Sequence, residues 1–107
     1  MAKIRPRLDL DDVCSALRSE RRRRTVRLLA NRSGATTRAE LARTLAEEDP
    51  EGATSEAVEL SLYHVHLPKL VDLNAVRHDA DAGTVAITET GRRIHQYLDE
   101  ADRTGCE

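Results

Sequence analysis

The chain has 107 residues, of which 17 are basic and 19 acidic, with 39% apolar residues and 2% aromatic ones. This length and composition fit one globular domain and exclude most multidomain enzymes. The apolar residues never run long enough for a membrane-spanning helix, and residues 1–10 lack the apolar stretch of a signal peptide. We therefore expect a cytoplasmic protein without a membrane partner, and with no Trp or Phe we expect no aromatic cage or base-stacking platform.

The charge is distributed unevenly along the chain. Residues 1–38 include 11 basic and 4 acidic residues, whereas residues 39–107 include 6 basic and 15 acidic ones. Such an asymmetry indicates either a face that binds a polyanion or a pairing of unlike poles within or between molecules. The composition does not choose between these two interpretations.

Hydrophobic periodicity predicts three helices in the first half of the chain. The apolar residues between Leu10 and Leu17 recur at helical spacing beside three aspartates that favour a helix N-terminus, so we predict a helix over 9–19. A second helix is predicted over 20–31, and Ser33-Gly34 lies in the break that follows it. The segment Thr37-Arg38-Ala39-Glu40 matches the capping box, which predicts a third helix from there to about residue 48.

A fourth helix is predicted after the turn at 49–52, with Thr54 as its cap. The helical period places an inward stripe on this helix, formed by Leu60, Tyr63, Leu67 and Leu70. A second apolar stripe is then expected nearly opposite, covered either by the first helices of the same chain or by a partner subunit; it consists of Val58, Leu62 and Val65. Pro68 lacks a backbone N–H and frees the carbonyl of His64, so a kink or a break is expected there.

A short hairpin and a last helix are predicted in the remainder of the chain. Asn74 suits the left-handed residue that closes a helix, and the strands 76–78 and 84–87 flank the turn-rich segment 79–83. Thr88 is expected to cap an amphipathic helix that continues to about residue 102. The expected organisation is a flexible basic segment at 1–8, one domain over 9–102 and a frayed tail at 103–107.

This order of elements resembles the winged helix-turn-helix fold, and two local motifs strengthen the resemblance. The segment 66–76 (HLPKLVDLNAV) is similar to the end of the recognition helix in arsenic-repressor-like regulators, with Asn74 in place of a glycine at the cap. The segment 87–94 (ITETGRRI) is similar to the join between strand and helix after the wing, where Gly91 would allow close packing. The fold class that this resemblance implies is mainly α with a small β-hairpin wing.

A narrower resemblance rests on the run Arg21–Arg24 together with the segment 62–70 (LYHVHLPKL). These features resemble a family of small haloarchaeal domains of unassigned function, over about residues 9–100. The resemblance implies a cytoplasmic protein of salt-adapted archaea that acts in transcriptional control, without an established ligand or target.

Double-stranded DNA is the partner that a helix-turn-helix predicts, because the second helix of the motif enters the major groove while basic side chains contact phosphates. The candidate DNA contacts are Arg21, Arg22, Arg23, Arg24, Arg27, Arg38, Ser61, His64, Lys69 and Arg77. The arginine run has an alternative interpretation as a solvated helix face that pairs with the acidic residues 47–49 or with a partner. Lys69 is the only basic residue between Thr54 and Leu73, and acidic residues flank Arg77, so the predicted reading helix and wing offer little positive charge.

A homodimer is predicted from the amphipathic helices near the two ends of the chain, and it would read two half-sites about one helical turn apart. The candidate interface residues are Leu10, Val13, Leu17, Ile94, Tyr97 and Leu98, unless they pack on the core of their own chain. The competing function is a protein–protein interaction module on a winged-helix scaffold that has lost DNA reading. DNA binding requires the arginine run and the fourth helix on one positive face, whereas an interaction module would show an apolar patch with acidic surroundings.

Enzymatic and metal chemistry find little support in the sequence. There is no nucleophile elbow, P-loop, dinucleotide fingerprint or paired-carboxylate site, so we expect no enzyme, no cofactor and no small-molecule ligand. His64 and His66 are two residues apart and do not face each other on a helix, and only His95 and Asp99 have a ligand-like spacing. We therefore predict no metal site and expect Cys14 and Cys106 to be free thiols, leaving metal sensing as a minor alternative.

Overall fold

The computed structural model describes the backbone of residues 10–104, and the side chains of residues 13–100 within that range. The fold is mainly helical with a small antiparallel sheet. In chain order the elements are α1 (Leu10–Ala16), α2 (Glu20–Ala30), β1 (Thr36–Thr37), α3 (Arg38–Glu47), α4 (Ser55–Ser61), the π-helical segment η1 (Leu62–His66), α5 (Leu67–Asp72), β2 (Val76–Asp79), β3 (Thr84–Ile87) and α6 (Glu89–Thr104). The predicted N-terminal segment 1–8 and residues 105–107 of the predicted tail lie outside the described residues, whereas residues 103 and 104 end α6.

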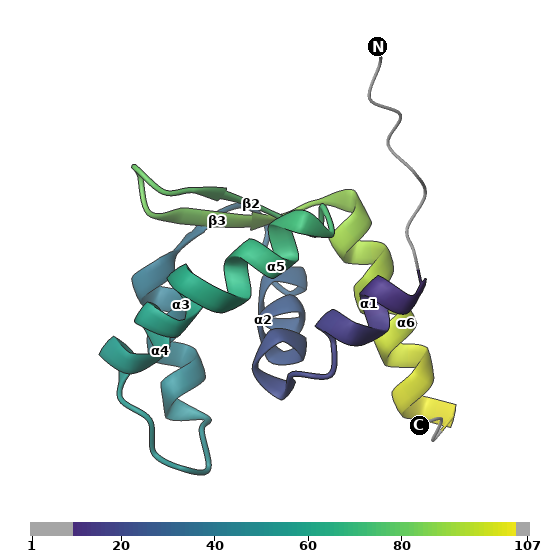
Figure 1. Cartoon of the computed structure of the whole chain (residues 1–107), viewed down its shortest axis with the longest axis horizontal. Helices are drawn as coiled ribbons and strands as arrows, with labels where there is room; N and C mark the ends of the chain where they lie inside the picture. The colour runs from purple at the N-terminus through teal and green to yellow at the C-terminus, as the bar shows by residue number, and fades with distance from the viewer. Residues whose placement is uncertain (1–9, 105–107) are drawn as a thin grey trace.

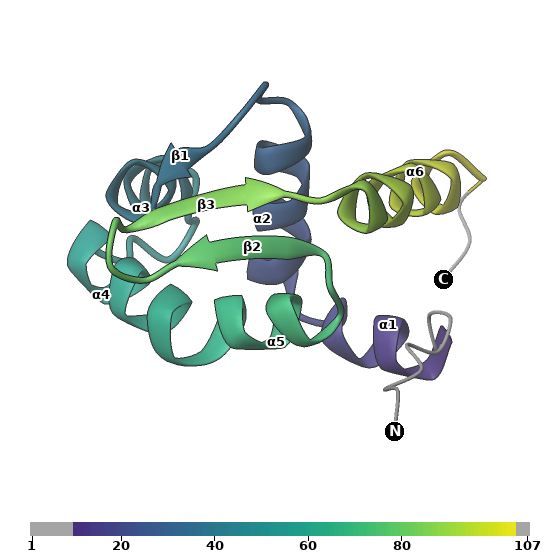
Figure 2. The same cartoon turned by 90° about the horizontal axis from the view of Figure 1, so that it is seen from above.

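The sheet covers one end of the helices, as Figure 1 shows. Its three strands have the order β1-β3-β2, with Val76 opposite Ile87 in the hairpin and Thr36 opposite Val85 on the other side of β3. Seen from above, α3 and α4 lie on one side of α2, while α1 and α6 lie on the other (Figure 2). The two-residue strand β1 is missing from the sequence prediction, because so short a strand carries no periodicity and is formed by pairing with β3.

The predicted helix caps are present at three positions. The hydroxyl of Thr37 accepts a hydrogen bond from the Glu40 N–H at 3.0 Å, and Thr54 caps α4 through the Ala57 N–H at 3.1 Å. Thr88 caps α6 in the same way. The carboxylate of Glu40 accepts from Arg43, 2.7 Å away, so the hydroxyl half of the predicted capping box is the half that forms.

The C-terminus of the helix that ends at α5 also follows the sequence prediction. Asn74 has a φ of 62°, and the next N–H, that of Ala75, returns to the carbonyl of Leu70 at 2.9 Å. Gly91 lies against this turn: a Cβ at Gly91 would collide with the carbonyl oxygen of Ala75 and with the side chain of Ile87. The glycine therefore permits the close packing that the resemblance predicted.

Residues 55–72 form one continuous helix with a π-helical turn in its middle, and this turn overturns part of the predicted inward stripe. Leu67 and Leu70 are buried as expected, but Leu60 and Tyr63 are 62% and 42% exposed. Val58 and Leu62, expected on the opposite side, are fully buried in the core of the same chain. Only Val65 of the second stripe faces solvent.

The physical reason for this correction is one extra residue in the turn. The N–H of Leu67 donates to the carbonyl of Leu62, five residues earlier, so the inward positions are separated by five residues there and not by three or four. Pro68 has no N–H for an α-helical bond to His64, and a π turn just before it accommodates the missing donor without ending the helix. In place of the predicted kink or break, the helix therefore continues with its inward positions shifted by one residue.

Candidate functional site

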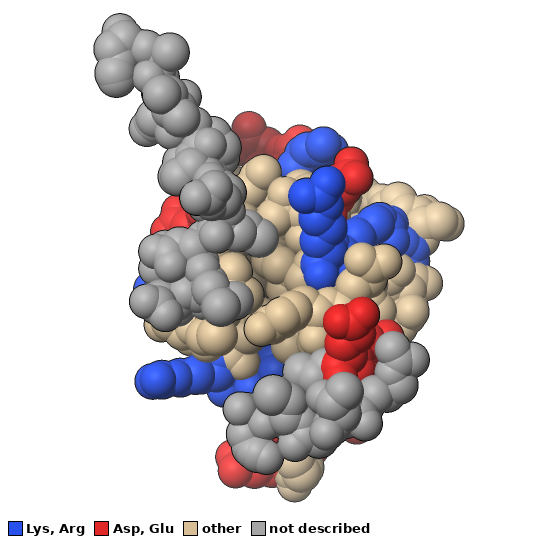
Figure 3. Space-filling view, turned by 90° about the vertical axis from the view of Figure 1, so that its right-hand side faces the viewer, with Lys and Arg blue, Asp and Glu red and all other residues tan. Residues whose placement is uncertain are grey.

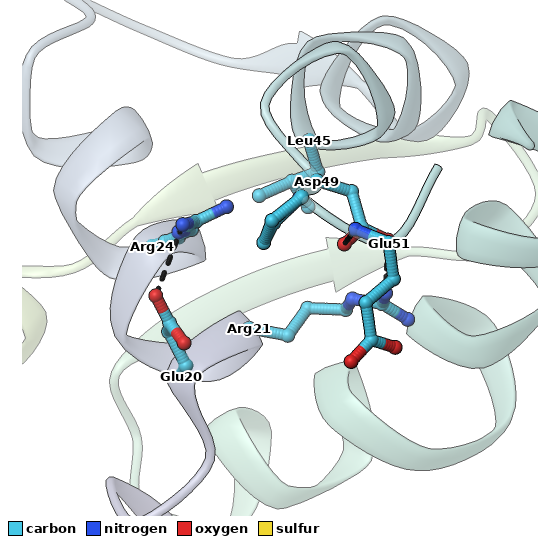
Figure 4. A pocket seen from close by; sticks show the side chains of 7 residues that line it. Glu20, Arg21, Arg24, Leu45, Asp49 and Glu51 are labelled. Atoms are coloured by element: carbon cyan, nitrogen blue, oxygen red, sulfur yellow. Dashed lines mark hydrogen bonds and ion pairs between the residues drawn. The ribbon is translucent and has the colours of Figure 1, made fainter. Parts of the chain in front are cut away.

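The arginine run of α2 is engaged in contacts within the chain. All four of its side chains are half-buried. Arg21 lies 3.4 Å from the carboxylate of Asp49, and Arg24 binds the carboxylate of Glu20 at 3.0 Å and the carbonyl of Glu48 at 2.9 Å, as Figure 4 shows for the two carboxylates. The contacts of Arg21 with Asp49 and of Arg24 with Glu48 join the start of α2 to the end of α3, and the first of them is an ion pair with the acidic residues 47–49 of the alternative interpretation.

Arg22 and Arg23 bind the end of α1. Arg22 donates to the carbonyl of Ala16, and Arg23 donates to the carbonyls of Leu17 at 2.6 Å and Arg18 at 2.9 Å. The last carbonyls of a helix have no partner within that helix, so these guanidinium groups satisfy them. These contacts attach the end of α1 to α2.

Arg22 also reaches the π segment. Its Nη1 lies 3.2 Å from Nδ1 of His66. Burial, and to a smaller extent the charges of Arg22 and Arg21, together lower the pKa of His66 from 6.5 to about 4. The imidazole is therefore neutral at physiological pH and accepts the hydrogen bond from the guanidinium.

Arg38 connects three elements at the opposite side of the molecule. Its Nη1 donates to Nε2 of His78 at 2.9 Å, its Nε lies 3.5 Å from the carboxylate of Glu59, and its guanidinium carbon lies 4.9 Å from the ring centroid of Tyr63. Burial lowers the pKa of His78, the charge of Arg38 lowers it further, and Asp79 opposes both. Arg38 thus holds the hairpin to the helix 55–72 with a side chain that is only 19% exposed.

The predicted DNA contacts are distributed over several places in the structure, and Arg23 lies at the end of α1. Arg21 and Arg24 line a hollow at the end of α3, whereas Arg22 and Lys69 line another beside α1. Arg38 and Arg77 lie at the hairpin, Arg27 and Ser61 are partly buried, and His64 is exposed on the π segment. On the face of the molecule shown in Figure 3, basic and acidic side chains are interspersed over a largely uncharged surface.

A different surface, between helix 55–72 and the hairpin, emerges from the structure. Two adjoining hollows share Ala80 at the hairpin tip, and we call them together the helix–wing surface. The first is lined by Arg38, Glu56, Glu59, Leu60, Tyr63 and Ala80, and the second by Val71, Asn74, Val76, Arg77, His78, Asp79, Ala80 and Asp81. The linings contain four carboxylates, and of their two arginines only Arg77 is exposed.

Helix 55–72 exposes large apolar side chains, three of which line the helix–wing surface: Leu60, Tyr63 and Val71. Among the described side chains five large apolar ones are exposed, and four of these lie on helix 55–72: Leu60, Tyr63, Val65 and Val71. A contiguous exposed apolar patch with a polar rim is typical of an interaction site. The sequence analysis missed Leu60 and Tyr63 as surface residues because it applied an unbroken helical period; the five-residue spacing from Leu62 to Leu67 just before a proline was the available signal.

The predicted dimer residues are distributed between the core and the surface. Four of them are buried in the same chain, at 9% exposure or less: Val13, Leu17, Ile94 and Leu98. Tyr97 is 51% exposed, and the side chain of Leu10 lies outside the described residues. These four residues therefore pack on the core of their own chain, which was the alternative to a dimer interface.

The described part of the chain also bears on metal sites and membrane spans. No group of three or more His, Cys, Asp or Glu side chains there is arranged to hold a metal ion. None of the helices within residues 10–104 is both long and apolar enough to cross a membrane. Cys14 is an exposed free cysteine, and Cys106 lies outside the described residues.

Comparison with known proteins gives one family assignment. No curated protein and no solved structure is significantly similar to this chain. A family model matches residues 14–86, which extend from within α1 into β3 and leave α6 outside. The chain therefore belongs to the DUF7344 family, which is described as a domain of unknown function.

Proposed function

We propose that this protein is a protein–protein interaction module built on a winged helix-turn-helix scaffold. The observation that carries the proposal is the exposed apolar row on helix 55–72, which carboxylates border along the hairpin side. An acidic rim repels the phosphates of DNA, whereas apolar side chains with a charged rim are the usual composition of a protein interface.

The order of elements supports the scaffold. Helix α3, the connection at 48–54 and helix 55–72 follow one another as in a helix-turn-helix, and the hairpin β2–β3 lies beside the second helix (Figures 1 and 2). In a DNA-binding protein this second helix would present polar and basic side chains to the groove. Here Leu60, Tyr63 and Val65 are exposed on this helix and offer apolar area for a protein partner, and Lys69 is its only basic residue besides the histidines.

The proposal is tested by photo-cross-linking in living cells of the native host. A benzophenone amino acid at Val65 is expected to form covalent adducts with another protein, and the additional change Leu60→Ser is expected to reduce them. The same photoreactive residue at Gln96, which is exposed on α6 and lies outside both predicted interfaces, is the control and should give no such adduct. Absence of protein adducts at Val65, or equal adducts at both positions, would contradict the interaction function.

DNA binding is the second candidate, and the exposed cations Arg43, Lys69 and Arg77 around the helix-turn-helix favour it. Fluorescence anisotropy with mixed genomic DNA fragments over a salt series tests it. Phosphate contacts would make the logarithm of affinity fall linearly with the logarithm of salt concentration. Weaker binding by Lys69→Glu and Arg77→Glu than by the matched change Arg93→Glu on α6 would favour DNA over protein as the partner.

Homodimerisation through the ends of the chain stays a prediction. Among the described side chains, Tyr97 is the predicted interface residue that is exposed. Light scattering over a wide concentration series tests it, and a mass of one chain throughout the series would contradict it.

A further inference from the structure

We propose that the helix–wing surface binds an extended segment of another protein in which basic residues alternate with apolar ones. This inference rests on the proposed function and names the chemistry of the partner. It depends on three features of the surface, which are its uncompensated carboxylates, its exposed apolar side chains and the free edge of β2.

The carboxylates provide the charge complementarity. Glu59 is neutralised by Arg38, and the carboxylate of Asp79 accepts the backbone N–H groups of Asp81 and Ala82 in the hairpin turn. Within the described part of the chain, Glu56 has no ion pair, and the side chain of Asp81 has none either. These two groups lie on the two sides of Ala80 and offer negative charge to a lysine or arginine of the partner.

The apolar side chains line the same two hollows as these charges. The exposed Leu60 and Tyr63 line the first hollow, and the exposed Val71 lines the second together with the buried Val76. The Tyr63 ring is held in place, since Arg38 covers one of its faces and the rings of His64 and His78 meet it edge to face at 4.9 and 5.9 Å. A ring already fixed in the free protein loses little side-chain entropy when a partner binds against it.

The strand edge favours an extended partner. β2 is at the edge of the sheet, because its only neighbouring strand in the described chain is β3, and all four of its residues line the second hollow. An unpaired edge offers backbone N–H and C=O groups to an added strand. Side chains of such a strand alternate between the two faces, so basic and apolar residues in alternation would separate toward rim and hollow.

The first experiment measures peptide binding by fluorescence anisotropy with the full chain. The probe is a fluorescein-labelled peptide of alternating lysine and leucine, and it is compared with an alternating glutamate–leucine peptide, an alternating lysine–serine peptide and a permuted lysine–leucine peptide with a helical pattern. The alternating lysine–leucine peptide is expected to bind most tightly. Equal or tighter binding of the glutamate–leucine peptide would overturn the preference for basic residues. The same result with the lysine–serine peptide would overturn the preference for apolar residues, and with the permuted peptide it would overturn the extended conformation.

Matched variants locate the binding. Glu56→Lys is expected to weaken binding at least about fivefold, whereas Asp99→Lys, the same charge change on exposed α6, should leave it within about twofold. Leu60→Ser is expected to weaken it about fivefold, and Tyr97→Ser should not. All four changes replace exposed side chains, so folding is expected to be retained, and circular dichroism verifies it. Equal effects within either pair would overturn the location.

Two further outcomes separate this inference from the function on which it rests. Protein adducts from Val65 in cells together with failure of the lysine–leucine peptide would leave the interaction function standing and overturn only the partner's chemistry. Sedimentation velocity that shows a dimer dissociated by Leu60→Ser would identify a second copy of this chain as the occupant and overturn the proposal. A single-chain species that binds the peptide supports it.

Discussion

His66 is a residue whose surroundings couple its protonation to folding. It lies in the π segment with its Nδ1 accepting from Arg22, and burial together with the two nearby arginines lowers its pKa to about 4. A proton on Nδ1 would remove the acceptor and place a second positive charge beside the guanidinium. The folded protein therefore excludes a proton that the unfolded chain takes up near pH 6.5.

The free energy of unfolding is accordingly expected to fall as the pH decreases from about 6.5 to about 4, and this contribution is level below that range. The full shift would correspond to about 3 kcal/mol, and because the ring is only half-buried, solvent screening reduces the expected loss to about 1 kcal/mol. Urea unfolding between pH 7 and 4.5 measures it. His66→Asn keeps an acceptor that does not titrate and should flatten the curve; an unchanged slope in this variant would contradict the assignment.

Gly91 is a residue whose missing side chain is required by packing. A methyl group there would overlap the backbone of Ala75, which closes the helix before the hairpin. Gly91→Ala is therefore expected to destabilise the fold by about 2 kcal/mol, although alanine is the better helix former by about 1 kcal/mol. Thermal unfolding measures the change, with Gln96→Ala on the exposed face of α6 as the control, expected within about 0.5 kcal/mol of the wild type.

At the scale of one element, the π turn determines which side of helix 55–72 faces the core. It allows Val58 and Leu62 before the turn and Leu67 and Leu70 after it to share one buried face. The turn is equivalent to a one-residue insertion in an α-helix, and such insertions are frequent at functional sites. Here its consequence is to expose Leu60 and Tyr63, which carry the proposed interaction.

Removing the inserted residue tests this account. Deletion of Val65 together with Pro68→Ala would leave a four-residue spacing between the leucines now at 62 and 67 and restore the donor for a regular α-helix. We expect the free energy of unfolding to stay within about 1 kcal/mol of the wild type. Deletion of Lys69, also exposed, instead breaks the spacing of Leu67 and Leu70 and is expected to cost at least about 3 kcal/mol. Urea unfolding compares the two, and equal losses would contradict the insertion model.

At the scale of the whole molecule, arginines hold the elements together. Arg22 and Arg23 attach α1 to α2, Arg21 and Arg24 attach α2 to the end of α3, and Arg38 attaches the hairpin to helix 55–72. Most of the described arginines in residues 1–38 thus contact groups of the same chain. The uneven charge seen in the sequence is in this part a pairing within the molecule.

Loss of the Arg38 contacts is expected to loosen the hairpin as a unit. Arg38→Met retains the apolar stem and removes the hydrogen bond to His78 and the ion pair with Glu59, and we expect a loss of about 1–2 kcal/mol with faster hydrogen exchange in β2. Arg43→Met is the matched control, since Arg43 is exposed and forms a surface ion pair with Glu40. Equal exchange rates of β2 in the two variants would contradict the role of Arg38.

The sequence by itself determined the local features of this protein. The predicted helix starts at Thr37, Thr54 and Thr88, the left-handed Asn74 and the hairpin around residues 79–83 are all present, because caps and turns depend on side chains within a few residues. The buried positions of the end helices were also accessible from periodicity, as Ile94 and Leu98 show.

Only the tertiary structure decided which side chains of helix 55–72 reach solvent and what the arginines contact. The π turn depends on how Leu62 and Leu67 pack on the rest of the core, and a regular period cannot anticipate it. The partners of Arg22 and Arg38 are 44 and 40 residues away in the sequence, at His66 and His78. A long, flexible cation binds whichever carbonyl, imidazole or carboxylate the fold brings near. The run of arginines that suggests DNA contacts in the sequence therefore also joins helices within the folded chain.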